Sequence, residues 1–286
     1  MGTLRTKEVA RNAPSRRLGH MGIARQASPQ PEYCLNQARI QDVVLLGAMG
    51  DAHGGRFLRL EGLKRELKDL DLLLLAGDIT DSSDINAYGT VLRAIRKRSD
   101  APIVAAFGND EYEQDRPTFR ERYDITFLDD ERVDMEVDGH TVRIVGTTGV
   151  LDRPTWWQRN NVPGIHEAYR KRVDIVASLL ERDGCDVLIL LSHYATTYRT
   201  LRGETERAFP EMGSRAMEAV LLDKRPDLSI HAHAHGGSRF AVVSKKQRTL
   251  DGARGVLVWN VSLPLNKGVT RFEITVGETN DVRVRH

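Results

Sequence analysis

DVVLLGAMGDAHGG, residues 42–55, joins an apolar run to a short turn that contains Asp51 and His53. Residues 43–50 are all apolar or glycine, so the run offers apolar side chains to both of its faces. Such a pattern is typical of a strand buried in the middle of a sheet. The stretch therefore predicts a central strand whose carboxyl end carries polar side chains.

The same arrangement recurs along the chain. Four further apolar runs occupy residues 71–77, 101–108, 185–192 and 227–233. Between them, leucines and other apolar residues recur at helical spacing over residues 54–70, 85–98 and 166–182. Alternating strands and helices predict an α/β fold.

Polar side chains follow each of the five runs directly. Taken alone, an Asp after a strand is usually a helix cap, an Asn a turn residue, and a His a packed or surface side chain. In α/β sheets, however, ligands bind beyond the carboxyl ends of the strands, so we expect the five clusters to converge. Their donors are nitrogen and oxygen without thiolate, which favours Mn, Fe, Zn, Co or Ni. The clusters contain Asp51, His53, Asp78, Asp81, Asn109, Asp110, His193, His233 and His235.

The motifs DAHGG, GDITD, GNDE, LSHY and HAHAH, in this order over residues 42 to about 240, resemble the calcineurin-like metallophosphoesterases. As a set, the five motifs are far more specific for this family than any one of them is alone. The resemblance, closest to the small single-domain bacterial and archaeal branch, implies a two-sheet β-sandwich flanked by helices in four αββα layers. It also implies hydrolysis of a phosphate ester by a hydroxide that bridges two divalent ions.

Carried over residue by residue, the resemblance implies seven metal ligands. One ion would be held by Asp51, His53 and His235, and the other by Asn109, His193 and His233. The carboxylate of Asp78 would bridge the two ions. Alternation along a strand would point His231 to the same side as the last two histidines. Because only His233 and His235 match the family motif, we expect His231 to be a hydrogen-bonded or packed neutral imidazole, and Asp81 to be a supporting residue.

Asp110 departs from the family pattern, because it stands where the family has a histidine that binds phosphate and protonates the leaving group. An ionised Asp110 would repel a phosphate dianion, whereas a raised pKa would let it act as the acid. A diester carries one charge fewer than a monoester, so we expect a preference for phosphodiesters. The alternatives are a phosphomonoesterase or nuclease, and a metal-binding sensor or interaction scaffold with little turnover.

Residues 151–172 form an expected loop-like insertion before a helix. Here Trp156 could stack on a base, Arg153 could bind phosphate, and His166 is a second candidate catalytic residue. Alternatively, the paired tryptophans anchor the loop to the core. The stretch after His193 adds Tyr194 and Arg199 as candidate substrate contacts.

Four short β-branched stretches end the chain, namely RFAVVS, GVLVWNVSL, VTRFEITV and DVRVRH. With turn residues between them they predict an antiparallel sheet that packs on the first. Asn260, near the end of one of these strands, is expected to satisfy a local turn.

Residues 1–40 hold seven Lys and Arg against Glu8 and Glu32 and show no periodicity. They predict a basic, disordered extension that precedes one domain over residues 41–286. The whole chain has a net charge of +2, and residues 1–40 alone carry +5, so the rest of the chain is slightly acidic. Long duplex nucleic acid is therefore not an expected partner. The expected partner is a phosphate-ester small molecule or a nucleotide.

Two isolated cysteines, Cys34 and Cys185, and no apolar run approaching ~18 residues predict a cytoplasmic protein without a membrane span.

Overall fold

The computed structural model describes residues 43–244, 255–277 and 282–286. The predicted extension over residues 1–40, which contains Cys34, lies outside the described residues, as do residues 251–252 and 278–280 among the turn residues expected between the last four strands. Within the described part, no helix is long and apolar enough to cross a membrane.

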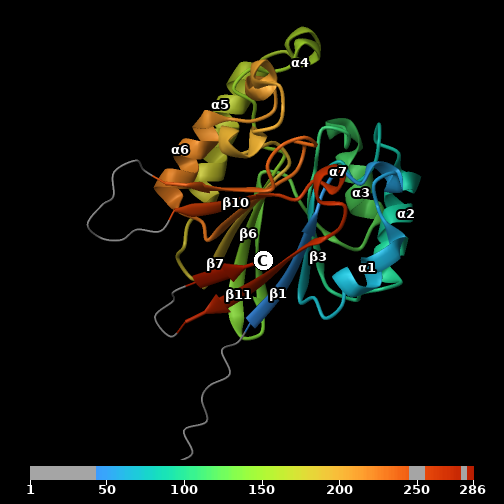
Figure 1. The fold of residues 1–286 in the computed structure, drawn as a ribbon. Coiled ribbons are helices and arrows are strands. Elements are labelled where there is room, and N and C mark those ends of the chain that lie inside the picture. The colour runs from blue at the N-terminus through green and yellow to red at the C-terminus, as the bar shows by residue number, and fades with distance from the viewer. Residues whose placement is uncertain (1–42, 245–254, 278–281) are drawn as a thin grey trace, which may run out of the picture. The chain divides into compact units, whose positions relative to one another are not determined.

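The chain forms two six-stranded sheets (Figure 1). The first sheet has the order β12-β11-β1-β2-β3-β4, in which β1 to β4 run parallel, β11 pairs antiparallel with β1, and β12 pairs antiparallel with β11. Its strands are β1 (Val43–Met49), β2 (Leu72–Ala76), β3 (Ile103–Ala106), β4 (Thr126–Leu128), β11 (Thr270–Val276) and β12 (Val282–Arg285).

The second sheet has the order β5-β6-β7-β8-β10-β9. Strands β6, β7, β8 and β10 are parallel, and β5 and β9 pair antiparallel at the two edges. Its strands are β5 (Glu131–Val137), β6 (His140–Thr147), β7 (Val187–Ser192), β8 (Leu228–His231), β9 (Phe240–Val243) and β10 (Val256–Asn260).

The two sheets bury their facing sides against each other. Alternate residues of both contribute to one core, as Val44 and Leu46 do from β1 and Val187 and Ile189 do from β7. The intervening residues point outward and pack under helices, because a strand alternates its side chains between its two faces. Helices cover the outer face of each sheet, which confirms the predicted four-layer αββα sandwich.

Helices α1 (Leu60–Glu66), α2 (Ile85–Arg96) and α3 (Arg116–Arg122) cover the first sheet, and α5 (Ile165–Leu179) and α6 (Arg215–Lys224) cover the second. The remaining α-helices are α4 (Trp156–Asn161) and α7 (Leu263–Asn266), and the 3₁₀ helices are η1 (His53–Gly55), η2 (Glu113–Asp115), η3 (Tyr198–Leu201) and η4 (Glu206–Glu211). The helix predicted over residues 54–70 is shorter, because Gly62 takes a φ of 85° inside it and the chain before Leu60 is not α-helical.

The prediction that the C-terminal strands form a single antiparallel sheet is wrong. The last four strands form two antiparallel pairs that join different sheets: β9 and β10 extend the second sheet from β8, and β11 and β12 extend the first sheet from β1. Local pattern identified the strands, but their partners are set by packing with distant parts of the chain.

Candidate metal centre

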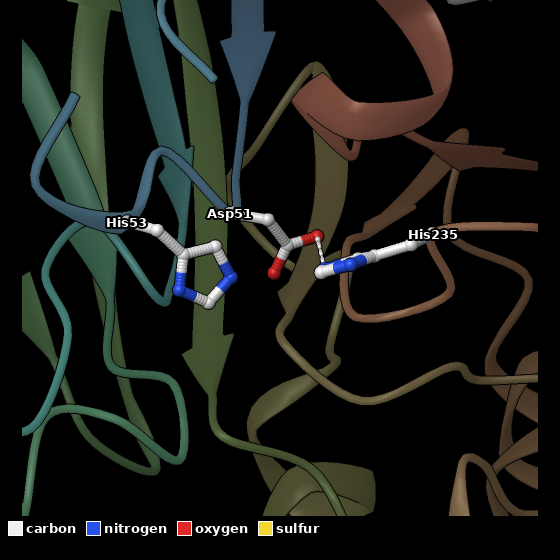
Figure 2. Close-up of side chains that lie close together, drawn as sticks. All are labelled: Asp51, His53 and His235. Carbon is white, nitrogen blue, oxygen red and sulfur yellow. Dashed lines mark ion pairs between the residues drawn. The ribbon is translucent and has the colours of Figure 1, made fainter. Parts of the chain in front are cut away.

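The polar turns after β1, β2, β3, β7 and β8 meet at the carboxyl ends of both sheets. The ligand atoms of Asp51, His53 and His235 lie within 4.8 Å of one another. Figure 2 shows the two imidazoles on opposite sides of the Asp51 carboxylate, with Asp51 Oδ2 3.4 Å from His235 Nε2. Three residues, from turns that follow strands of both sheets, thus form a first group of candidate ligands.

Asp78, His193 and His233 form a second group by the same criterion. Asp78 Oδ2 lies 3.4 Å from His193 Nε2, and Asn109 Oδ1 lies 3.0 Å from the same nitrogen. All seven predicted ligands are therefore brought into the two groups or beside them. The bridging role of Asp78 stays a prediction.

Two buried atoms of the first group fit a metal ion well. Asp51 Oδ1 and His53 Nε2 are buried and have no hydrogen-bond partner among the described residues. A buried polar atom without a partner is costly, and a cation would satisfy both atoms at once. The donor set is nitrogen and oxygen, as the transition ions of such centres require.

The backbone at four of these residues has an unusual conformation. Asp51, His53, Asp78 and His233 have φ values of 55°, 46°, 51° and 67°, in the left-handed region. Asp and His enter this region more readily than most residues, but it still strains the chain. Backbone hydrogen bonds from Asp51 N to Gly77 O (3.0 Å) and from His53 N to Asp78 O (3.1 Å) hold the first two turns together.

Two glycines allow the turns to approach this closely. A Cβ on Gly77 would lie 2.6 Å from the backbone of Gly108, and a Cβ on Gly108 would lie 2.1 Å from Asp78 Oδ1. No side chain fits at either position. The glycines of the GD and GN motifs are thus required by packing of backbone on backbone.

Glu111 supports the backbone of the centre, a role that was not predicted from the sequence. Its buried carboxylate accepts four backbone N–H groups, from Gly108 (2.7 Å) and Asp78 (2.9 Å) on Oε2 and from Ile79 (2.8 Å) and Thr80 (3.2 Å) on Oε1. It therefore ties the turn after β2 to the turn after β3. An acid at the end of GNDE was the available signal.

Asp81 and Asp110 both face His53. His53 Nδ1 donates to Asp81 Oδ1 at 2.6 Å, which leaves Nε2 to face Asp51, and Asp110 Oδ2 lies 3.5 Å from the same Nδ1. The Asp110 carboxylate, helped by Asp81 and opposed by burial, raises the pKa of His53 to about 9. The ligand atoms of His53, Asp81 and Asp110 also lie within 4.8 Å of one another, so the supporting role of Asp81 and the role of Asp110 as the catalytic acid both stay predictions.

The buried charges also shift the other groups. Burial alone would raise the pKa of Asp51, but a hydrogen bond with His235 and the charges of His193 and His235 hold it at about 2. Burial would likewise lower the pKa of His193, yet the carboxylate of Asp78 raises it to about 9. The Asp78 carboxylate thus favours a protonated His193, whereas burial favours a neutral His233 and lowers its pKa to about 3.

His231 lies apart from this cluster. It ends β8, is fully buried, donates from Nδ1 to Ala232 O at 2.7 Å and accepts at Nε2 from Thr200 Oγ1 at 2.7 Å. Burial lowers its pKa to about 4, so it is a neutral packed imidazole. The expected alternation to His233 is wrong, since the strand ends at His231 and φ at His233 is positive.

Asn260 does more than complete a turn. Its Oδ1 accepts from Ser262 N at 3.2 Å, as a local turn residue would, but its Nδ2 donates to Ala234 O at 2.7 Å. The second bond holds the segment between His233 and His235. Its partner is distant in sequence, and so local pattern gave no sign of it.

Of the predicted substrate contacts, only Tyr194 is beside the centre. Its ring lies 4.9 Å from that of His233. Arg153 pairs with Glu211 (3.0 Å) and Arg199 with Glu218 (3.3 Å), and neither lines the cavity beside the metal groups. Each guanidinium is directed to a nearby acid, and a contact of either one with a substrate stays a prediction.

The predicted loop that carries the tryptophans contains α4, which begins with a capping box between Thr155 and Gln158. Trp156 and Trp157 are 70% and 60% exposed, so they do not anchor this segment to the core. Trp157 lines the cavity beside the metal groups, whereas Trp156 and the exposed His166 do not. A catalytic role for His166 has no support in this geometry.

Comparison with solved structures gives matches to the same fold. A phosphopantetheinyl hydrolase from Mycobacterium tuberculosis is 14% identical with a TM-score of 0.53, over 76% of this chain and 88% of its own. A Staphylococcus aureus protein provisionally assigned as a 5′-nucleotidase is 16% identical with a TM-score of 0.54, over 85% of this chain and 53% of its own. At these identities the likeness shows the fold alone. No curated protein sequence matches the chain.

The model of the family described as calcineurin-like phosphoesterase matches residues 45–237, which contain all seven candidate ligands. Enzymes of this family hydrolyse phosphate esters with two divalent metal ions. The match covers well over half of the chain. The chain therefore belongs to the calcineurin-like phosphoesterase family and is a metal-dependent hydrolase.

Proposed function

We propose that the chain is a phosphodiesterase whose two ions are held by the two residue groups described above. Asp51, His53 and His235 would hold one ion, and Asn109, His193 and His233 the other, with Asp78 between them. The observation that carries this proposal is the convergence of two groups of ligand atoms, each within 4.8 Å, at the carboxyl ends of both sheets.

Hydrogen bonds outside the ligand atoms support this assignment. His193 Nδ1 donates to Ala76 O at 2.9 Å, so Nε2 is the nitrogen left for an ion. Asp81 fixes His53 in the same way, with Nε2 free. Such contacts set the tautomer and orientation of ligating histidines. Two divalent ions bound there would polarise the phosphate and lower the pKa of a bound water toward neutrality.

The preference for diesters rests on the charge of Asp110. A histidine at this position would bring a positive charge or a proton to the phosphate, whereas a carboxylate brings a negative charge. Asp110 is 28% exposed, so its side chain can face a substrate at the mouth of the centre. A dianionic monoester is repelled more strongly than a monoanionic diester.

The test compares initial rates on bis-p-nitrophenyl phosphate and p-nitrophenyl phosphate after chelation and re-addition of Mn²⁺. Asp78→Ala serves as the blank and Asp124→Ala, at an exposed position, as the matched control. We expect metal-dependent turnover in wild type and control, no turnover in the blank, and faster hydrolysis of the diester. Faster hydrolysis of the monoester would contradict the preference, and turnover by Asp78→Ala would contradict the site.

A further inference from the structure

A cavity of about 750 Å³ opens directly beside the second group of candidate ligands. Asn109 and His233 form part of its wall. The segment that follows Asn109, including η2, lines one side, and α4 and the start of α5 line the other. An ester whose phosphate lay at the ligands would have its organic group in or near this cavity.

The lining of the cavity combines apolar and aromatic side chains with polar and charged ones. Seven residues contribute the apolar and aromatic side chains: Tyr112, Leu151, Trp157, Val162, Ile165, Tyr169 and Tyr194. Aromatic side chains beside convergent polar groups are typical of a site for a small organic molecule. The aromatic side chains of this lining offer faces on which a flat ring can stack.

Trp157 lines this cavity with a side chain that is 60% exposed, and hydrogen bonds of neighbouring residues fix the helix that carries it. The capping box fixes the first turn of α4, and Gln158 Nε2 donates to Tyr194 Oη at 3.3 Å. Trp156 precedes it by one residue, about 100° around the helix, is 70% exposed and does not line the cavity. The helix thus presents one indole to the cavity and the other to solvent.

The cations of the cavity are already engaged. Arg116 donates to Asp129 Oδ1 at 2.6 Å, to Thr148 Oγ1 at 3.1 Å and to Glu111 O at 3.3 Å. Arg172 donates to Asp130 Oδ2 at 2.7 Å and to Gly149 O at 3.3 Å. With both charges balanced by carboxylates, the cavity does not favour a second anionic group.

From this lining and this charge balance we propose that the cavity binds the organic group of the substrate, and that this group is an uncharged flat ring that stacks on Trp157. The substrate class is then a phosphate ester of an aryl or nucleoside type with a single phosphate, and polyphosphorylated esters are excluded. The inference rests on the proposed function, since it takes the phosphate to lie at the metal ligands.

The test separates the ring from the phosphate. Trp157→Ala and the matched Trp156→Ala are compared in KM for bis-p-nitrophenyl phosphate and in the inhibition constant of inorganic phosphate, which has no ring. Because stacking on an aromatic side chain is lost, we expect Trp157→Ala to raise KM about five- to tenfold with kcat within about twofold. The phosphate inhibition constant should not change, and Trp157→Phe should restore most of the KM.

Calorimetric binding of benzylphosphonate to the Mn²⁺-loaded protein gives a second readout that does not need turnover. If wild type hydrolyses neither ester, the proposed function fails, but weaker benzylphosphonate binding by Trp157→Ala than by Trp156→Ala would still support the cavity. Equal KM values and equal benzylphosphonate affinities in the two variants would overturn the inference while leaving hydrolysis untouched. An equal rise in KM and in the phosphate inhibition constant would also overturn it.

Discussion

Replacing Glu111 by Gln tests how the two central turns are held together. The carboxylate accepts two backbone N–H groups on each oxygen, at 2.7 to 3.2 Å. Glutamine keeps one oxygen and its two bonds but turns an NH₂ group toward the other two N–H donors. Hydrogen bonds to charged groups contribute about 1.5–3 kcal/mol each, so losing two costs about 3–6 kcal/mol. That is a large part of the ~5–15 kcal/mol by which domains are stable.

The measurement is urea unfolding of the chelated protein, with the midpoint and slope compared between wild type and Glu111→Gln. Chelation removes the contribution of bound ions to stability. Glu121→Gln, at an exposed position of α3, is the matched control and should change stability by less than about 0.5 kcal/mol. A loss below about 1 kcal/mol in Glu111→Gln would refute the role of Glu111 as the acceptor for four N–H groups.

Two further predictions concern the centre itself. Gly108→Ala should abolish most Mn²⁺-dependent hydrolysis, because the added Cβ would lie 2.1 Å from Asp78 Oδ1. Gly139→Ala, whose Cβ meets nothing within 4 Å, should keep its rate although a φ of 78° strains an alanine there, and equal rates in the two variants would count against this. Metal affinity should rise with pH up to about 9, because His53 and His193, whose pKa values are about 9 without ions, must lose their protons to bind. Calorimetric Mn²⁺ titration at about pH 6.5 and about pH 8.5 checks this. The affinity should rise roughly tenfold per pH unit for each proton that the metal displaces. An affinity independent of pH would contradict the prediction.

Local sequence patterns predicted the strands and the polar turns that build the centre. An apolar run and the polar residue after it are adjacent in the chain, so Asp51, Asp78 and His193 could be placed at strand ends without knowledge of the fold. Their convergence followed from a general property of parallel sheets. The order of the motifs along the chain supplied the resemblance to the family and, with it, the assignment of the ligands.

The features that escaped prediction depend on residues far apart in the chain. Arg153 and Arg199 have the charge to bind phosphate, but acids 58 and 19 positions away engage them. The contribution of Trp157 rather than Trp156 depends on the rotation of a six-residue helix that had been expected to be a loop. Neither fact is encoded within a short window of sequence.

The pairing of β11 with β1 has a consequence for biosynthesis. Strand β1 is the first described strand to leave the ribosome, yet its outer edge is covered only when residues 270–276 have been made. Until then, the nascent chain carries an unpaired apolar strand, and such edges readily join strands of other chains. A polypeptide that stops after β10 would retain every candidate ligand and still carry this open edge, so premature termination would produce an aggregating product with its metal ligands complete.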